Sequence, residues 1–177
     1  LWLIIAAGAG VIITGDAQAQ IMFEQQPMKM ASAESLCETE TGPGFSVLSI
    51  GRQNNCENIE HVIEIPKMLS FLANHDFDST LQGVEELQEQ YTRAFAGQPN
   101  VPANQNFAPN LFVTYWGFRA MITWALGSVI VALGGLWLTR KNKVISSRKF
   151  GLLALWMIPT PFLANASGWI FTEMGRQ

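Results

Sequence analysis

The chain has 177 residues, of which 49% are hydrophobic and 14% charged, and its formal net charge is −3. An average soluble domain carries about 25% charged residues, so this composition is unusually poor in charge. Eleven lysines and arginines against fourteen acids exclude a basic nucleic-acid-binding protein. The apolar content excludes a disordered tail, and its uneven distribution along the chain indicates a membrane protein.

The first apolar run, Leu1–Ile13, carries no charge. As a helix it would rise about 20 Å, less than the hydrocarbon core of about 30 Å. We interpret residues 1–15 as the end of a spanning helix whose beginning is missing. A secretory signal is the alternative, because Ala17-Gln18-Ala19 resembles a cleavage site, but no basic start precedes it. The abrupt start and the end at Gln177 without a polar tail predict a piece of a longer polypeptide.

Two further apolar runs are long enough to span a membrane. The first covers residues 111–138, and the second covers residues 150–173 with Phe150–Phe171 as its apolar part. Pro159 and Pro161 interrupt the second run. Proline removes a backbone donor, so we expect a kink there. Membrane helices tolerate such a break where neighbouring helices satisfy the freed backbone groups.

Charge differs sharply between the connecting segments. Residues 139–149 hold five basic residues and no acid, whereas residues 16–110 hold four basic residues and thirteen acids. Short basic loops face the cytoplasm, so residues 139–149 are predicted to be cytoplasmic. Residues 16–110 and the short end at 174–177 are then extracytoplasmic. The predicted fold is an all-α transmembrane helix bundle fragment with a long extracytoplasmic loop that contains short helices.

The long extracytoplasmic segment carries local structural signals. Pro27 could open a helix reaching Glu34, and Phe45–Ile50 alternates as a short strand does. Apolar residues recur at helical spacing before a stop at Gly97, and a linker follows at 100–110. The members of this helical pattern are Leu81, Val84, Leu87, Tyr91 and Phe95.

The two cysteines, Cys37 and Cys56, lie in the segment predicted to be outside, where disulfides persist. We predict that they form a disulfide, which would contribute roughly 3 kcal/mol by restricting the unfolded chain. Two free thiols are the alternative. The cysteines and the two histidines lack metal-ligand spacing, so we interpret His61 and His75 as solvated loop residues.

Charged residues within membrane spans are costly and therefore indicate functional sites. Arg119 lies near the start of its span, where it could bind a ligand or simply extend toward the interface as an anchor. Trp169, Glu173 and Arg176 share one helix face by their spacing. Glu173 could pair with Arg176, ligate a metal or relay protons. Taken alone, Met121 would be a packing residue.

Three sequence blocks together resemble subunit I of the cytochrome bd quinol oxidases. They are QQPMKMASAES (25–35), GFRAM (117–121) and GWIFTEMGRQ (168–177). The resemblance covers essentially the whole chain and matches the middle-to-late part of that subunit. The loop between Lys29 and Arg119 is shorter than in the long-loop members, so the chain resembles the short-loop subclass.

The resemblance implies roles for individual residues. Residues 16–110 correspond to the family's quinol-binding loop, with Lys29 and Glu34 in quinol oxidation. Met121 corresponds to the axial ligand of the low-spin haem b iron and Glu173 to that of the high-spin haem b iron. Arg119 and Arg176 correspond to cofactor-binding residues, and Trp169 to a residue between the haems that serves electron transfer. The ligands of haem d fall outside this chain.

The implied function is that of a respiratory terminal oxidase. Such an enzyme oxidises quinol at the outer face and passes electrons through the b haems to haem d. Oxygen is reduced there to water, and a proton-motive force arises without pumping. The resemblance also implies a bacterial plasma membrane location with several spans, a second large subunit, and small accessory membrane subunits in some members. From the residues alone, a non-catalytic membrane anchor and a proton-coupled transporter remain alternatives.

Overall fold

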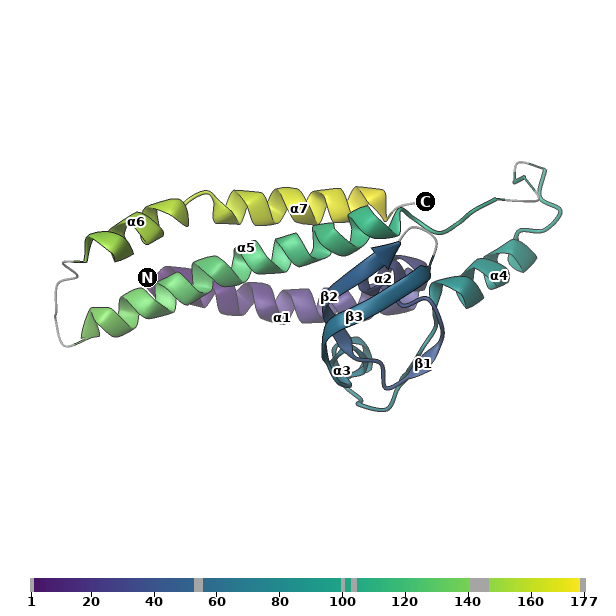
Figure 1. The fold of residues 1–177 in the computed structure, drawn as a ribbon, viewed down its shortest axis with the longest axis horizontal. Coiled ribbons are helices and arrows are strands. Elements are labelled where there is room, and N and C mark those ends of the chain that lie inside the picture. Colours follow the sequence, from purple (N-terminus) through teal and green to yellow (C-terminus); the bar gives the residue numbers. More distant parts are fainter. Residues whose placement is uncertain (1, 53–55, 100, 103–104, 141–146, 176–177) are drawn as a thin grey trace.

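The computed structural model describes residues 2–52, 56–99, 101–102, 105–140 and 147–175. Long helices lie alongside one another, and the shorter elements gather at one end of them (Figure 1). The elements in chain order are α1 (Trp2–Gln25), α2 (Pro27–Glu34), β1 (Glu40–Thr41), β2 (Phe45–Arg52), β3 (Glu57–Ile65), α3 (Met68–Asn74), β4 (Thr80–Leu81), α4 (Val84–Ala94), α5 (Leu111–Leu138), α6 (Arg148–Trp156) and α7 (Thr160–Met174).

Three helical stretches are long and apolar enough to cross a membrane: α1, α5, and α6 with α7 taken together. Their outward surfaces are strongly apolar; Trp2 is 76% exposed and Trp137 is 72% exposed. Contiguous apolar surface of this extent is not found on a soluble monomer and marks contact with lipid or other helices. The prediction of a helical membrane protein is confirmed.

The break predicted at the two prolines is present. α6 ends at Trp156 and α7 begins at Thr160, with turn residues between them. Pro159 stands at the N-cap of α7 and Pro161 lies in its first turn, where proline is tolerated because those amide groups lack helical partners. The two helices together still form one stretch of spanning length.

The first helix extends further than its apolar run. α1 continues past Asp16 to Gln25, and α2 starts after the single residue Gln26. The Thr14 hydroxyl donates to the carbonyl of Gly10 within the helix, so this polar residue does not interrupt it. Pro27 occupies the first turn of α2, as expected, and Ser35 ends the helix with a left-handed backbone (φ 52°).

The strand expected over Phe45–Ile50 is β2, which pairs antiparallel with β3. Its buried face differs from simple alternation. Ser46 and Ser49 are buried, whereas Val47 and Ile50 are exposed. The register shifts between Ser46 and Leu48 and again between Leu48 and Ser49. Such bulges re-aim side chains, and here they turn two serines that are three residues apart toward the same side.

Two other expectations about the 16–110 segment need adjustment. The helical pattern ending near Gly97 is α4, but Leu81 lies before it, in β4, which pairs with β1. His61 is exposed but lies in β3 rather than in a loop, and His75 caps the C-terminus of α3. Charged residues interrupt the apolar residues of β3, so periodicity alone did not predict this strand.

The core of the segment forms around α2, in which every residue from Met28 to Glu34 is buried. A cluster of apolar residues from α2, α3, α4 and the start of α5 surrounds one side of this helix. Met30 and Ala33 pack on the other side against Phe171 of α7. A disulfide joins Cys37, just after α2, to Cys56 at the start of β3 and links the helix to the hairpin.

The arrangement has a clear polarity. The shorter elements lie at the end of the long helices where α1 ends, α5 begins and α7 ends (Figure 1). At the opposite end α5 ends and α6 begins with Arg148 and Lys149, the last two residues of the predicted basic connection (Figure 1). Lys141 and Lys143 of this connection lie outside the described residues.

Candidate functional site

The short helix α2 carries Lys29 and Glu34 into the interior, where they are 5% and 3% exposed. The two residues are five positions apart, so they occupy different sides of the helix. Glu34 contacts α5 through Arg119, and Lys29 contacts α7 through Phe171. α2 therefore connects the two spanning helices that carry the other predicted site residues.

Glu34 and Arg119 form a buried ion pair. Nη2 of Arg119 lies 2.6 Å from Oε2 of Glu34, and their side chains are 8% and 3% exposed. Arg119 also donates from Nη1 to the carbonyl of Ala33 and from Nε, at 3.1 Å, to the carbonyl of Ser46. A planar guanidinium presents five donors in a fixed fork and can reach several separate acceptors at once, whereas a lysine ammonium is a compact group with three donors. Arg119 therefore acts as a structural junction and does not extend to the interface as an anchor.

Aromatic rings enclose the same guanidinium. Its Cζ lies 3.8 Å from the centre of the Tyr115 ring and 5.1 Å from that of Phe45. Phe118 lies on a further side at 5.6 Å. Attraction between a cation and an aromatic face strengthens when water is excluded, as it is here. Tyr115 precedes Arg119 by one helical turn, which places both on one face of α5.

Burial raises the pKa of Glu34 from 4.5 to about 7, although the charge and the hydrogen bond of Arg119 oppose this rise. The backbone N–H of Ser46 also donates to this carboxylate and favours its ionised form. A carboxylate with a pKa near neutrality can take up and release a proton at physiological pH. This property is typical of catalytic acids and bases.

Ser35, the residue after Glu34, supplies an unused hydrogen-bonding group. Its hydroxyl is buried and has no hydrogen-bond partner among the described residues. An unsatisfied buried hydroxyl costs about 1–3 kcal/mol, so such groups are often reserved for a ligand or an ordered water. The buried carboxylate of Glu34 thus lies next to a hydroxyl able to contact a polar ligand.

Lys29 is held against the C-terminal end of α7. Its Nζ lies 5.1 Å from the centre of the Phe171 ring. A side chain at Gly175 would place its Cβ only 2.6 Å from Cγ of Lys29. The aliphatic part of Lys29 therefore occupies the space that this glycine leaves, and Gly175 is required for the position of the lysine.

Met121 follows Arg119 by two residues and lies against α7. A Cβ at Gly168 would be 2.8 Å from Sδ of Met121, so the thioether fills the space above this glycine. Thioether sulfur is an axial ligand in one class of haem proteins. Its half-buried place between two spanning helices fits a haem-binding role, with Gly168 setting the position of the sulfur.

Trp169 and Glu173 lie one helical turn apart on α7, and both are exposed. Phe171, between them in sequence, is buried against α2. The tryptophan and the carboxylate therefore lie on a different face of α7 from the one that contacts Lys29. A carboxylate on a spanning helix is costly in hydrocarbon, which marks Glu173 as a candidate functional residue. Arg176 lies outside the described residues.

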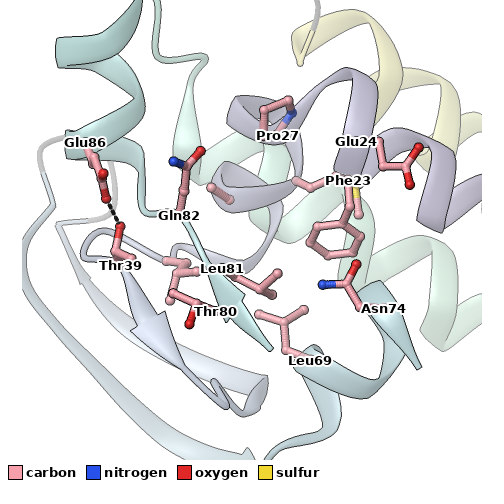
Figure 2. Close-up of a pocket in the computed structure, with 13 residues that line it drawn as sticks. Phe23, Glu24, Pro27, Thr39, Leu69, Asn74, Thr80, Leu81, Gln82 and Glu86 are labelled. Carbon is pink, nitrogen blue, oxygen red and sulfur yellow. Dashed lines mark hydrogen bonds between the residues drawn. The ribbon is translucent and has the colours of Figure 1, made fainter. Parts of the chain in front are cut away.

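A separate pocket of about 490 Å³ lies between the end of α1, α2, α3, β4 and α4 (Figure 2). Phe23, Leu69 and Leu81 give it an apolar floor, with Glu24 and Glu86 near its edge (Figure 2). Met30 and Ala31, in the middle of α2, line this pocket. Lys29, Glu34 and Arg119 do not line it. This pocket and the buried charged cluster are therefore distinct features that both adjoin α2.

Sequence reasoning missed several residues that build the site. Ser46 was taken only as part of a strand, and Tyr115, Gly168 and Gly175 were not singled out. Tyr115 had a detectable signal, since it stands four residues before Arg119 on a predicted helix. Ser46 had none, because its burial depends on the shifted register of the hairpin.

Comparison with known proteins agrees over the whole chain. A family model described as cytochrome bd terminal oxidase subunit I matches residues 1–177. Cytochrome bd ubiquinol oxidase subunit 1 of Bacillus subtilis is 35% identical over 173 residues, covering 98% of this chain and 36% of that protein. Cytochrome bd-II ubiquinol oxidase subunit 1 of Escherichia coli is 26% identical, covering 95% of this chain and 42% of that protein.

The solved structure of bd oxidase from Geobacillus thermodenitrificans has the same fold as this chain. The match covers 96% of this chain and 35% of the matched chain in that structure. The TM-score is 0.71 and the sequence identity is 24%. The chain thus spans only 36% and 42% of the length of the two relatives.

Proposed function

Because the chain belongs to the cytochrome bd terminal oxidase subunit I family, we propose that it forms the quinol-oxidising part of a quinol:oxygen oxidoreductase. The observation that carries this proposal is the buried Glu34–Arg119 pair, in a segment set at one end of three membrane-length helices. Both related enzymes carry ubiquinol oxidase in their names. Quinol is an apolar molecule with two hydroxyls, so its oxidation calls for a proton acceptor at the membrane surface.

In this proposal Glu34 accepts a proton from a quinol hydroxyl. Its pKa of about 7 leaves a large fraction ionised near neutral pH, and Arg119 keeps that charge stable in a buried site. Lys29 donates a hydrogen bond to a quinol or quinone oxygen, and the Ser35 hydroxyl is a second contact. Each quinol that is oxidised releases two protons and two electrons.

The residues on α5 and α7 suit haem binding. When bound, the low-spin haem b, the high-spin haem b and haem d would supply electron transfer and the reduction of oxygen to water. We propose Met121 as a ligand to the low-spin haem b iron and Glu173 as a ligand to the high-spin haem b iron. Arg119 and Arg176 bind the cofactors, and Trp169 lies on the electron path between them. The haem d ligands belong to another part of the subunit.

We place the protein in the bacterial plasma membrane with residues 16–110 outside. The start of α6, with Arg148 and Lys149, and the acid-rich elements between α1 and α5 lie at opposite ends of the long helices, which supports this orientation (Figure 1). The uncovered apolar faces of α1 and α7 are suited to neighbouring helices and lipid. A second oxidase subunit, and small accessory membrane subunits, are the partners this proposal implies.

The test uses the complete oxidase complex containing this chain. Optical difference spectra should show b and d haem bands, and Met121→Leu should remove the low-spin b signal while the high-spin signal persists. Glu34→Gln should lower kcat for quinol oxidation about a hundredfold or more, the usual effect of losing a direct proton acceptor, with the haem bands intact.

A complex that lacks these haems, or one that keeps full quinol oxidase activity in Glu34→Gln, would contradict the proposal. An anchor without catalytic activity predicts neither haem bands nor quinol oxidation. A proton-coupled transporter predicts movement of a solute without quinol oxidation. The same preparation therefore separates all three readings.

A further inference from the structure

We infer that Tyr115 is a positioning residue, which holds the guanidinium of Arg119 in contact with Glu34 and is itself fixed by the β2–β3 hairpin. The inference rests on the proposed role of Glu34 as the acceptor of the quinol proton. It deepens that proposal, because it assigns the control of Glu34 to a tyrosine and a hairpin contact that the family resemblance does not single out.

Tyr115 lies directly over the charged group of Arg119. The centre of its ring is 3.8 Å from Cζ of Arg119, closer than the ring centres of Phe45 at 5.1 Å and Phe118 at 5.6 Å. Tyr115 is fully buried, and attraction between a cation and a ring face strengthens where water is excluded. Because Nη2 of Arg119 lies 2.6 Å from Oε2 of Glu34, the orientation of the guanidinium under this ring determines whether the ion pair forms.

Three contacts join Tyr115, Arg119 and Ser46 into a closed triangle. The ring of Tyr115 contacts the guanidinium, and Nε of Arg119 donates to the carbonyl of Ser46 at 3.1 Å. The hydroxyl of Ser46 lies 3.0 Å from the hydroxyl of Tyr115 and closes the triangle. A packed ring alone is free to tilt, whereas a ring hydrogen-bonded through its hydroxyl is held at its far end as well. The triangle therefore fixes the ring and the guanidinium relative to each other.

The β2–β3 hairpin is shaped so that it supplies this hydroxyl. Oγ of Ser46 is also hydrogen-bonded to Oγ of Ser49, which lies 2.7 Å from Nδ1 of His61. In a regular strand, residues three apart point to opposite faces, but the register shifts in β2 accompany the burial of both serines. Burying two hydroxyls while Val47 and Ile50 stay exposed runs against the hydrophobic effect, which indicates a requirement for the hydroxyls themselves. Support of the tyrosine meets this requirement.

The charges around Glu34 determine the direction of the effect. Among the described residues, Arg119 is the charged group that favours the ionised form of Glu34, and the N–H of Ser46 adds a hydrogen bond. Lys29, on the same helix, contacts Phe171 of α7. The titratable groups of the neighbouring elements are exposed or paired elsewhere: Asp16 (with His75) and Glu24 of α1, Glu60, His61 and Glu64 of β3, Glu85, Glu86, Glu89 and Arg93 of α4, and Glu173 of α7. A loosened guanidinium therefore raises the pKa of Glu34, because burial then acts with less opposition.

The test uses two variants of the complete oxidase complex that remove the same hydroxyl contact from opposite sides. Tyr115→Phe keeps the ring, and Ser46→Ala keeps the backbone contacts of Ser46 with Arg119 and Glu34. In each variant, the pH at which kcat/KM for quinol oxidation is half-maximal should rise by about half a pH unit, which lowers kcat/KM on the acidic side about threefold. The double variant should shift no further than either single variant, because both remove one contact.

Tyr91→Phe is the matched control. It removes the other tyrosine hydroxyl of the chain, on α4, where the ring packs against Phe95 and Phe107. This variant should leave the pH profile unchanged. A tyrosine that only fills space predicts a lower thermal midpoint in Tyr115→Phe without a shift in the pH profile. In the Arg119→Lys background, Tyr115→Phe should add no further shift, because Tyr115 acts through the guanidinium.

An infrared titration separates this inference from the proposed function. The C=O band of the protonated Glu34 carboxyl, assigned by its loss in Glu34→Gln, reports the protonation of this residue whether or not it accepts the quinol proton. The titration midpoint of the band should rise in Tyr115→Phe and in Ser46→Ala. An unchanged midpoint in Tyr115→Phe, or a shift that persists in full in the Arg119→Lys background, would overturn the inference. Full quinol oxidation by Glu34→Gln would instead overturn the proposed function, and the infrared midpoint would still decide the role of Tyr115.

Discussion

Arg119 on a membrane-length helix and Glu34 on a short buried helix lie 2.6 Å apart, 85 positions apart in the chain. This pair joins the extramembrane segment to the helix that carries Met121. A buried ion pair contributes little to stability by itself, and breaking it by removing one partner typically costs 3–5 kcal/mol. Its value here is positional, since it fixes a titrating carboxylate next to the proposed haem-binding helix.

The first prediction concerns the acidic side of the pH profile. Glu34 accepts protons only when ionised, so quinol oxidation should decline as the pH falls through about 7. Arg119→Lys keeps the charge but loses the guanidinium donor that bonds the Glu34 carboxylate, which weakens the effect that lowers the pKa of Glu34. The decline should therefore begin at a higher pH, and the rate near pH 6.5 should fall several-fold.

Steady-state kcat/KM measured across pH 5.5 to 8.5 checks this shift. Arg93→Lys is the matched control, because Arg93 pairs with Glu89 on the exposed face of α4. It should leave the profile unchanged. If kcat/KM declines at the same pH in Arg119→Lys as in the unchanged protein, Glu34 is not the titrating group.

A second prediction concerns the position of the Met121 sulfur. Gly168→Ala would place a methyl group 2.8 Å from Sδ, too close for the thioether to remain where it is. We expect a shifted or weakened low-spin b haem band and an altered midpoint potential. Gly151→Ala on α6 is the control, since no atom lies within 4 Å of its added methyl group. Identical spectra for the two variants would refute the assignment of Met121.

A third prediction concerns Lys29. Gly175→Ala would force its stem away from α7, because the new Cβ would lie within 3 Å of Cγ, Cδ and Cε. If Lys29 holds a quinol oxygen, KM for quinol should rise several-fold while the haem spectra stay constant. Gly10→Ala on α1 meets open space and serves as the control. An unchanged KM in Gly175→Ala would argue against this role.

A fourth prediction concerns the disulfide between Cys37 and Cys56. Replacing both cysteines by serine should lower stability by about 3 kcal/mol in the chain-entropy picture, because the unfolded segment regains its freedom. The thermal midpoint of quinol oxidase activity should fall by several degrees, whereas loss of activity without a thermal shift would contradict this view. Mass spectrometry of non-reduced peptides should recover the two residues in one linked species.

Much of the architecture could be predicted from the apolar runs and from the prolines that interrupt them. The apolar run at 111–138 became α5 with those bounds, and Pro159 and Pro161 marked the break between α6 and α7. These features are local, since hydrophobic length and proline geometry act without reference to distant residues. α1 ran past Asp16 because one acid and a threonine do not end a helix that can bond its own backbone.

The site itself was only half visible. Lys29, Glu34, Arg119 and Met121 were named from motifs, but the contacts of Arg119 with Ala33 and Glu34 depend on pairings across more than 80 positions. The role of Ser46 depends on a register shift, which no periodicity in Phe45–Ile50 reveals. Long-range packing, and not local pattern, decides which polar residues of a hairpin are buried.

The shifted register of the β2–β3 hairpin sets a limit on how this segment can vary. Pairing without these shifts would place Ser46 and Ser49 on opposite faces, because residues three apart alternate in a regular strand, and one serine hydroxyl would then point to solvent. Most exposed positions of the hairpin can change identity with little effect on the interior. The shifted pairing is therefore a stricter constraint than the identity of the exposed side chains, so substitutions at Val47 or Ile50 should be tolerated better than changes that abolish the shifts.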